Sequence, residues 1–204
     1  DEIVALMTPI IKSFFTDIGM EITNDAIQVF GGYGYTKDQG IEQLFRDNRI
    51  TPIYEGTNSV QAIDLVYRKI LNNKIFEKYI AQLSNEVKEF AKDNTLSLFA
   101  GKFFKYLELL NNFTLWLGEK NKTSRDDVSG ACNDYLKVLG YVALAHSWLK
   151  ILRVSHSKLN ENKNFFEDKI NTAKYYFDKI LPRVQSHYLS AVTGSDTMMK
   201  SNFN

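Results

Sequence analysis

Apolar residues recur every three to four positions along most of the chain, the spacing that places them on one face of an α-helix. The first such stretch covers residues 5–29, and Pro9 behind Thr8 either opens this helix or kinks it. Its apolar positions are Ile10, Phe14, Ile18, Ile22, Ala26 and Val29. The helix is predicted to stop at Gly31-Gly32, because consecutive glycines favour non-helical backbone.

Two shorter helices are predicted before residue 73. The first contains Ile41, Leu44 and Phe45 and ends before Thr51-Pro52. A turn through Glu55-Gly56 then leads to a helix that Thr57 or Asn58 can cap. The apolar positions of this helix are Val60, Ile63, Leu65, Val66, Ile70 and Leu71.

After Asn72-Asn73 the chain is rich in Lys, Asn, Phe and Tyr, and its periodicity remains helical. We predict helices over residues 74–93, 96–119, 125–158 and 163–190, and a frayed end from residue 194 onwards. The fold class is therefore all-α. An incomplete helical domain over residues 1–73 precedes an antiparallel helical bundle over residues 74–204. The apolar faces of the first domain should dock on this bundle or on a second copy.

Composition narrows the possible functions. The 204 residues carry 25 Lys plus Arg against 24 Asp plus Glu, so no charge excess favours nucleic acid or an anionic membrane. We find no run of about 18 apolar residues and expect no membrane span. The single Cys132 excludes an intrachain disulfide and favours a reducing compartment, the cytoplasm or the mitochondrial matrix. The start at Asp1-Glu2 suggests a chain that begins partway through a longer protein.

Two segments carry candidate chemistry, and the first is residues 28–35, Gln-Val-Phe-Gly-Gly-Tyr-Gly-Tyr. Glycines this dense let a backbone approach a ligand closely, and free N–H groups near a helix end hold phosphate oxygens. By itself, however, the segment is explained more simply as the end of a helix.

The second segment contains Arg46-Asp47, then Ile-Tyr-Glu-Gly-Thr-Asn at residues 53–58, and Gln61. A carboxylate in a tight turn beside Ile53 and Tyr54 would be a stronger general base if it lay against an apolar pocket. The alternative is an exposed loop glutamate near a helix start, where negative charge is favourable in any case.

Together, the two segments closely resemble the acyl-CoA dehydrogenase family in residue order and spacing. The resemblance covers residues 3–73, about a third of the chain. Thr8-Pro9 and the Ala-Ile-Asp-Leu run at residues 62–65 look most like the larger branch of the family. That branch carries an additional helical carboxy-terminal extension, and residues 74–204 match its position.

The resemblance implies a role for each matching residue. Glu55 corresponds to the base that removes the α-proton of an acyl-CoA thioester, and its backbone N–H would bind the thioester carbonyl next to Gly56. The matched cofactor residues contact FAD, the first group usually in a neighbouring subunit: Gln28, Val29, Phe30, Gly31 and Gly32, then Thr57, Asn58 and Ser59. Arg46-Asp47 is interpreted as a structural pair that braces the turn.

The implied reaction is the FAD-dependent dehydrogenation of an acyl-CoA to a trans-2-enoyl-CoA, a step of fatty-acid β-oxidation. An electron-transfer flavoprotein is the expected electron acceptor, and a homodimer or higher homo-oligomer is the expected assembly. The upstream helices and the β domain that hold the flavin are not in the chain, so we expect these 204 residues alone to be inactive. An acyl-CoA oxidase is the enzymatic alternative. A non-catalytic interaction or dimerisation module is the other hypothesis for residues 74–204.

The remaining candidates carry less chemistry. His146, His156 and His187 are not at metal-ligand spacing, so no metal site is expected. Cys132 is interpreted as a small core residue, and Trp116 and Trp148 as core or subunit contacts.

Overall fold

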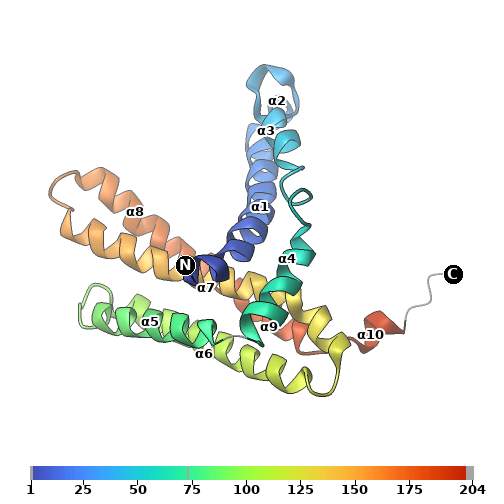
Figure 1. Ribbon diagram of the computed structural model, residues 1–204. Helices are drawn as coiled ribbons and strands as arrows, with labels where there is room; N and C mark the ends of the chain where they lie inside the picture. Colours follow the sequence, from blue (N-terminus) through green and yellow to red (C-terminus); the bar gives the residue numbers. More distant parts are fainter. Residues whose placement is uncertain (1, 73, 201–204) are drawn as a thin grey trace.

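The structure, a computed structural model, describes residues 2–72 and 74–200 and contains helices but no strands over these ranges, which confirms the all-α prediction (Figure 1). The first part comprises α1 (Glu2–Phe30), α2 (Gly32–Tyr35), η1 (Lys37–Gln39), α3 (Ile41–Asn48), α4 (Asn58–Asp64) and η2 (Leu65–Ile70). The second comprises α5 (Ile75–Phe90), α6 (Ser97–Lys120), α7 (Arg125–Ser157), α8 (Lys163–Tyr175), η3 (Tyr176–Ile180), α9 (Arg183–Ala191) and α10 (Asp196–Met199).

The 33-residue helix α7 is the centre of the bundle, and α6, α8 and α9 pack along it. Ser124 caps its first turn by accepting a hydrogen bond from the Asp127 backbone N–H at 3.2 Å. Its fully buried Tyr135 packs edge-on against Phe113 of α6, with ring centroids 5.1 Å apart. Aromatic packing of this kind explains why residues 74–190 are rich in Phe and Tyr.

Two of the predicted helices are interrupted by π-helical turns. The stretch predicted as one helix over residues 163–190 divides into α8, η3 and α9, because Pro182 has no N–H to continue the ladder. The Leu181 N–H instead bonds the Tyr176 carbonyl at 2.8 Å, a five-residue spacing. A second π turn, η2, continues α4, where the Leu71 N–H bonds the Val66 carbonyl at 2.9 Å.

The amino-terminal half of α1 docks on the middle of α7. Phe14 is buried against Tyr141, with ring centroids 4.8 Å apart and the planes nearly perpendicular. Gly140 makes this approach possible, because a Cβ atom there would lie 2.6 Å from Cγ of Phe14. The expectation that the first domain docks on the bundle is confirmed here. The other half of α1 projects away with α2 and α3 as an arm (Figure 1).

We expect Gly140→Ala to lower the free energy of unfolding by about 1–2 kcal/mol. The overpacking against Phe14 costs about 1–3 kcal/mol, and the better helix propensity of alanine recovers up to about 1 kcal/mol. Urea denaturation measures the change. The matched control is Gly101→Ala on α6, where no atom lies within 4 Å of the added Cβ, so this variant should gain stability. Equal effects of the two substitutions would contradict the close contact.

One face of α1 is apolar and exposed, including Ile11, Phe15, Ile22 and Val29. By length and composition alone, α1 is apolar enough to cross a membrane, with a mean hydropathy of 1.4 over a window that is 28% buried. This finding qualifies the expectation of no membrane span. The hydropathy of α1 is only weak support for a membrane span, because core helices pass the same test and α1 docks on α7.

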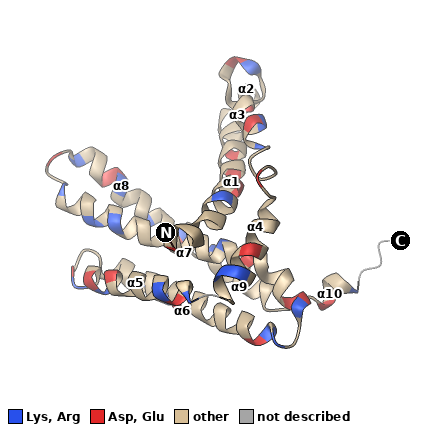
Figure 2. Cartoon of the chain, viewed as in Figure 1, with Lys and Arg blue, Asp and Glu red and all other residues tan. Residues whose placement is uncertain are grey.

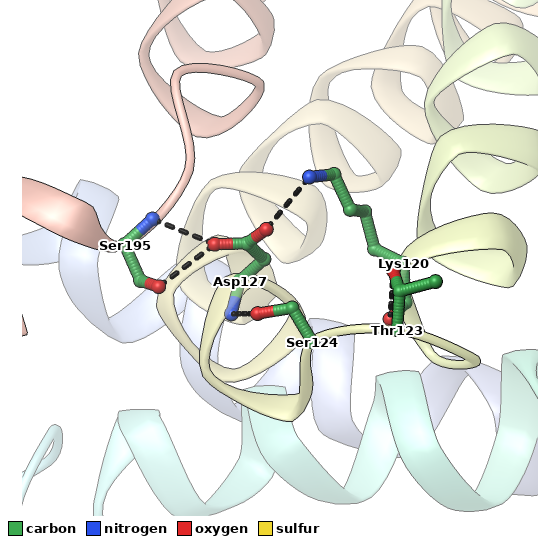
Figure 3. A network of polar contacts seen from close by, with 5 residues as sticks. All are labelled: Lys120, Thr123, Ser124, Asp127 and Ser195. Atoms are coloured by element: carbon green, nitrogen blue, oxygen red, sulfur yellow. Dashed lines mark hydrogen bonds and ion pairs between the residues drawn. The ribbon is translucent and has the colours of Figure 1, made fainter.

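The carboxy-terminal residues are anchored rather than frayed up to α10, which corrects the prediction for this segment. The backbone N–H and the hydroxyl of Ser195 donate to Oδ1 of Asp127 at 2.8 and 2.7 Å (Figure 3). Lys120 donates to Oδ2 of the same carboxylate at 2.8 Å. Residues 201–204, also predicted to fray, lie outside the described residues.

Candidate functional site

Glu55 lies in a turn with unusual backbone geometry. Its φ angle is 56°, and among the described residues other than glycine it alone has a positive φ. The next residue, Gly56, has a φ of 83°, so two consecutive residues are left-handed. Such a conformation costs a non-glycine residue about 1–3 kcal/mol and persists where the surroundings enforce it. Here Gln61 enforces it, because its side-chain amide donates to the Glu55 carbonyl at 3.1 Å.

Asn58 ties this turn to α1. Its side-chain amide nitrogen donates to Oδ1 of Asp17 at 2.7 Å, to the Ser13 carbonyl at 3.1 Å and to the Thr16 hydroxyl at 3.0 Å. Its amide oxygen accepts from Nζ of Lys12 at 2.8 Å. Both ends of the side chain are therefore occupied within the chain. Neither Asn58 nor Thr57 caps α4 through its side chain, contrary to the sequence-based expectation.

Glu55 borders a surface hollow of about 450 Å³ together with Thr8, Ile11, Lys12 and Gln61. Glu55 is exposed to solvent, and Ile11 is the one hydrophobic residue among the five that line this hollow. Ile53 and Tyr54, expected to flank Glu55 with apolar surface, are half exposed and do not line the hollow. An environment that excludes water from Glu55 is therefore not built by these residues.

The glycine segment lies at the far end of α1, at the tip of the arm (Figure 1). Gly31 has a φ of 59°, which ends α1 as predicted, and neither it nor Gly32 has any atom within 4 Å of a would-be Cβ. Gly34 is different, because a Cβ there would lie 2.5 Å from the Ile27 carbonyl oxygen. Gly31 and Gly32 thus form an open backbone shelf, while Gly34 is required by packing.

The two candidate segments do not meet within one chain. Lys12 borders the Glu55 hollow, and Gln28 lies 16 residues further along the same helix, which corresponds to about 24 Å. Of the predicted cofactor residues, Thr57, Asn58 and Ser59 lie beside Glu55, whereas Gln28, Val29, Phe30, Gly31 and Gly32 lie at the arm tip.

Arg46 does not brace the Glu55 turn, which corrects the interpretation of the Arg-Asp pair. Its guanidinium pairs with Glu42 at 2.5 Å, one turn earlier on α3. The turn is held by backbone bonds instead, from Tyr54 to the Ile50 carbonyl at 3.1 Å and from Asn58 to the Pro52 carbonyl at 3.2 Å.

Residues of α1 and α7 also hold the Glu55 turn in place, and none of them was predicted from the sequence. Lys12 and Asp17 of α1 bind Asn58, and no motif in the sequence marked them for this role. Asn133 of α7 donates to the Ser59 hydroxyl at 3.3 Å, which links the predicted cofactor segment to the second part of the chain.

The remaining titratable groups take structural positions. His146 contacts Glu86 at 2.9 Å and His187 contacts Asp134 at 2.8 Å. No group of three or more potential metal ligands occurs among residues 2–72 and 74–200. Burial raises the pKa of the Cys132 thiol to about 12, as befits the core residue predicted from the sequence.

Lys and Arg positions are interspersed with Asp and Glu positions along the helices (Figure 2). Two protein-family models match the chain. The acyl-CoA dehydrogenase carboxy-terminal domain matches residues 4–71, and the acetyl-CoA dehydrogenase carboxy-terminal-like family matches residues 83–202, more than half of the chain. The chain belongs to the acyl-CoA dehydrogenase family.

Curated relatives resemble this acyl-CoA dehydrogenase chain over its first part. A 3-methylmercaptopropionyl-CoA dehydrogenase of Ruegeria pomeroyi is 42% identical over 67 residues, 33% of this chain and 11% of the relative. A cyclohexane-1-carbonyl-CoA dehydrogenase of Geobacter metallireducens is 52% identical over 60 residues, 29% of this chain and 16% of the relative. The matched segment thus spans a small fraction of either relative.

A crystal structure of an acyl-CoA dehydrogenase from Bacillus anthracis, complexed with FAD, has the same fold as this acyl-CoA dehydrogenase chain. The TM-score is 0.70 at 15% sequence identity, and the match covers 96% of this chain and 34% of that one. Both parts of the chain therefore occur together in a known acyl-CoA dehydrogenase fold.

Proposed function

We propose that the protein containing this chain dehydrogenates an acyl-CoA thioester to a trans-2-enoyl-CoA with FAD, and that Glu55 is its catalytic base. The observation that carries the proposal is the left-handed backbone at Glu55, within the motif that resembles the family's base. Strained conformations cluster at active sites, where the surrounding structure sets the direction of a side chain. Gln61 and Asn58 provide that structure here.

The proposed chemistry assigns each group of the turn a task. The Glu55 carboxylate accepts the α-proton of the thioester, which is a weak acid in water. The backbone N–H of Glu55, beside Gly56, donates to the thioester carbonyl and stabilises the charge that develops on its oxygen. Bound FAD would supply the acceptor for the β-hydrogen, which leaves the substrate as hydride. The hydrogen bond from Gln61 to the Glu55 carbonyl keeps the base in position. A fixed position favours proton transfer, because the base must lie close to the proton it accepts.

The proposal gives FAD two separate contacts on this chain, the glycine shelf and the Glu55 turn. The open shelf of Gly31 and Gly32 leaves backbone accessible to a dinucleotide, as close approach requires. This shelf and the Glu55 turn lie about 24 Å apart along α1. We therefore propose a homodimer or higher homo-oligomer in which the shelf of one copy serves the flavin of another. The lone buried Cys132 accords with a reducing compartment, the cytoplasm or the mitochondrial matrix.

Anaerobic mixing of the full-length protein with acyl-CoA thioesters tests the reaction. The flavin absorbance should bleach, and the product should be the trans-2-enoyl-CoA. Reoxidation by an electron-transfer flavoprotein without peroxide supports a dehydrogenase, whereas rapid oxygen consumption with peroxide supports an oxidase. A full-length protein that binds FAD, but whose flavin none of the acyl-CoA thioesters reduces, would contradict the proposal. Residues 74–204 would then remain an interaction module.

Gly32→Trp in the full-length protein should lower FAD retention about tenfold, because an indole would stand between the backbone and the dinucleotide. A Cβ atom added at Gly32 meets no atom within 4 Å in this chain, so the indole can extend outwards and the fold should survive. Flavin absorbance per protein after gel filtration measures the effect. Gly101→Trp, equally unobstructed but on α6, is the control and should retain its FAD. Full retention by Gly32→Trp would contradict the predicted contact.

A further inference from the structure

An apolar trough lies between the carboxy-terminal half of α7 and the start of α8, on the hairpin that points away from α4 in Figure 1. Its volume is about 360 Å³, within the range of small-molecule sites. Eight residues line it: Trp148, Lys150, Ile151, Val154, Ser155, Phe165, Phe166 and Lys169. None of them belongs to the Glu55 turn or the glycine shelf.

The walls of this trough leave apolar side chains exposed to water. Ile151 is 37% exposed, Val154 45% and Phe165 51%. Ile151 and Val154 project from successive turns of α7, so the apolar surface runs along the helix. Together with Trp148, these side chains offer a narrow guest such as an alkyl chain a continuous apolar contact.

The charged lining residues are both lysines, and none of the eight is acidic. Lys150 is paired with Oε1 of Glu86 at 3.1 Å. Nζ of Lys169 lies 5.3 Å above the centre of the Phe165 ring. The positive charge at the trough is therefore only partly compensated, and an anionic group is the complementary partner.

We infer that the trough binds one medium-chain fatty-acid anion, with its alkyl chain against the apolar wall and its carboxylate beside Lys169 and Lys150. An elongated apolar surface with a cationic edge matches a guest that is apolar along its length and anionic at one end. This site is separate from the proposed dehydrogenation site and does not depend on it.

Calorimetric titration of the 204-residue chain with laurate, well below its critical micelle concentration at pH 7.5, tests the inference. One site should saturate. Affinity should rise about fourfold for each methylene from octanoate to laurate, because each buried methylene contributes about 0.8 kcal/mol. Dodecyltrimethylammonium, with the same chain and the opposite charge, should bind at least tenfold more weakly. Fluorescence of Trp148 in a Trp116→Phe background should report the same dissociation constant.

Two substitutions separate the apolar and the charged parts of the site. Lys169→Glu should weaken laurate binding about fivefold or more while leaving the far-ultraviolet circular dichroism unchanged. Ile151→Glu, which introduces a charge at a half-exposed position, should abolish it. Lys179→Glu on η3, exposed and outside the trough, is the control and should bind laurate normally.

Three results would overturn the inference. The first is equal affinity for laurate and dodecyltrimethylammonium, which would remove the anion preference. The second is unchanged laurate binding by both Lys169→Glu and Ile151→Glu. The third is absence of laurate binding together with self-association that Ile151→Glu abolishes, which would make the trough a contact between copies of the chain.

Discussion

Replacing Glu55 by glutamine in the full-length protein should slow the reduction of its flavin by acyl-CoA about 10²–10⁴-fold, the usual contribution of a general base. Glutamine keeps the size of the side chain and most of its hydrogen bonds but cannot accept the α-proton. FAD content and acyl-CoA affinity should change little, because the contacts proposed for both involve backbone and neighbouring side chains and not the Glu55 carboxylate. Stopped-flow bleaching of the flavin measures the rate.

A second substitution separates catalysis from stability at the same residue. Glu55→Gly should raise the unfolding free energy of the chain by about 1 kcal/mol, because glycine adopts a φ of 56° without the steric cost that glutamate incurs. The same variant should reduce flavin as slowly as Glu55→Gln. Glu108→Gln, an exposed glutamate on α6, is the control for both measurements. Near-normal flavin reduction by Glu55→Gln would remove Glu55 from the proposed role.

The helices were predictable because apolar periodicity depends on residues close together in sequence. The predicted ends of α6 and α7 agree with the structure within one residue, since polar connectors separate them. The division of residues 163–190 was missed, although Pro182 marked it. Pro182 cannot donate a backbone hydrogen bond, and the helix accommodates it with a π turn just before it. This turn leaves the apolar periodicity largely intact.

The site was predictable only as a motif. The motif identified Glu55. The turn that carries Glu55 is held through Asn58, which binds Lys12 and Asp17, more than 40 positions away in the sequence. Such contacts depend on how α1 and α4 lie against each other. The sequence left open whether Glu55 lies against an apolar pocket or in an exposed loop, and within the described residues it is exposed.

Removing the carboxylate of Asp127 should lower the free energy of unfolding by about 2–3 kcal/mol, the usual cost of losing hydrogen bonds to a buried charge. For a chain of this size that corresponds to a fall in Tm of roughly 5–10 °C. Asp127→Ala leaves the Lys120 ammonium and the Ser195 N–H without their acceptor. Thermal unfolding followed by circular dichroism measures the difference, and the exposed neighbour Asp126→Ala is the control.

The pH dependence gives a second, independent test of the same carboxylate. Hydrogen bonds from Lys120, and then from Ser195, hold the pKa of Asp127 well below its usual range. A depressed pKa in the folded state stabilises the protein above the unfolded value of about 3.9 and loses that contribution as the pH falls through the folded value. The stability difference between the wild type and Asp127→Ala should therefore be constant from pH 5 to 8 and shrink below about pH 4.

The position of α10 identifies which contact is lost. Ser195 immediately precedes α10, and a Cβ at Gly130 would lie 2.7 Å from Cε of Met198, so this short helix lies directly on α7. The backbone amides of α10 should therefore exchange with deuterium faster in Asp127→Ala than in the wild type, while Ser195→Ala, which keeps the backbone N–H, should fall between them. If Asp127→Ala loses stability but α10 stays protected, the carboxylate stabilises the α6–α7 connection through Lys120 and does not hold the carboxy-terminal segment.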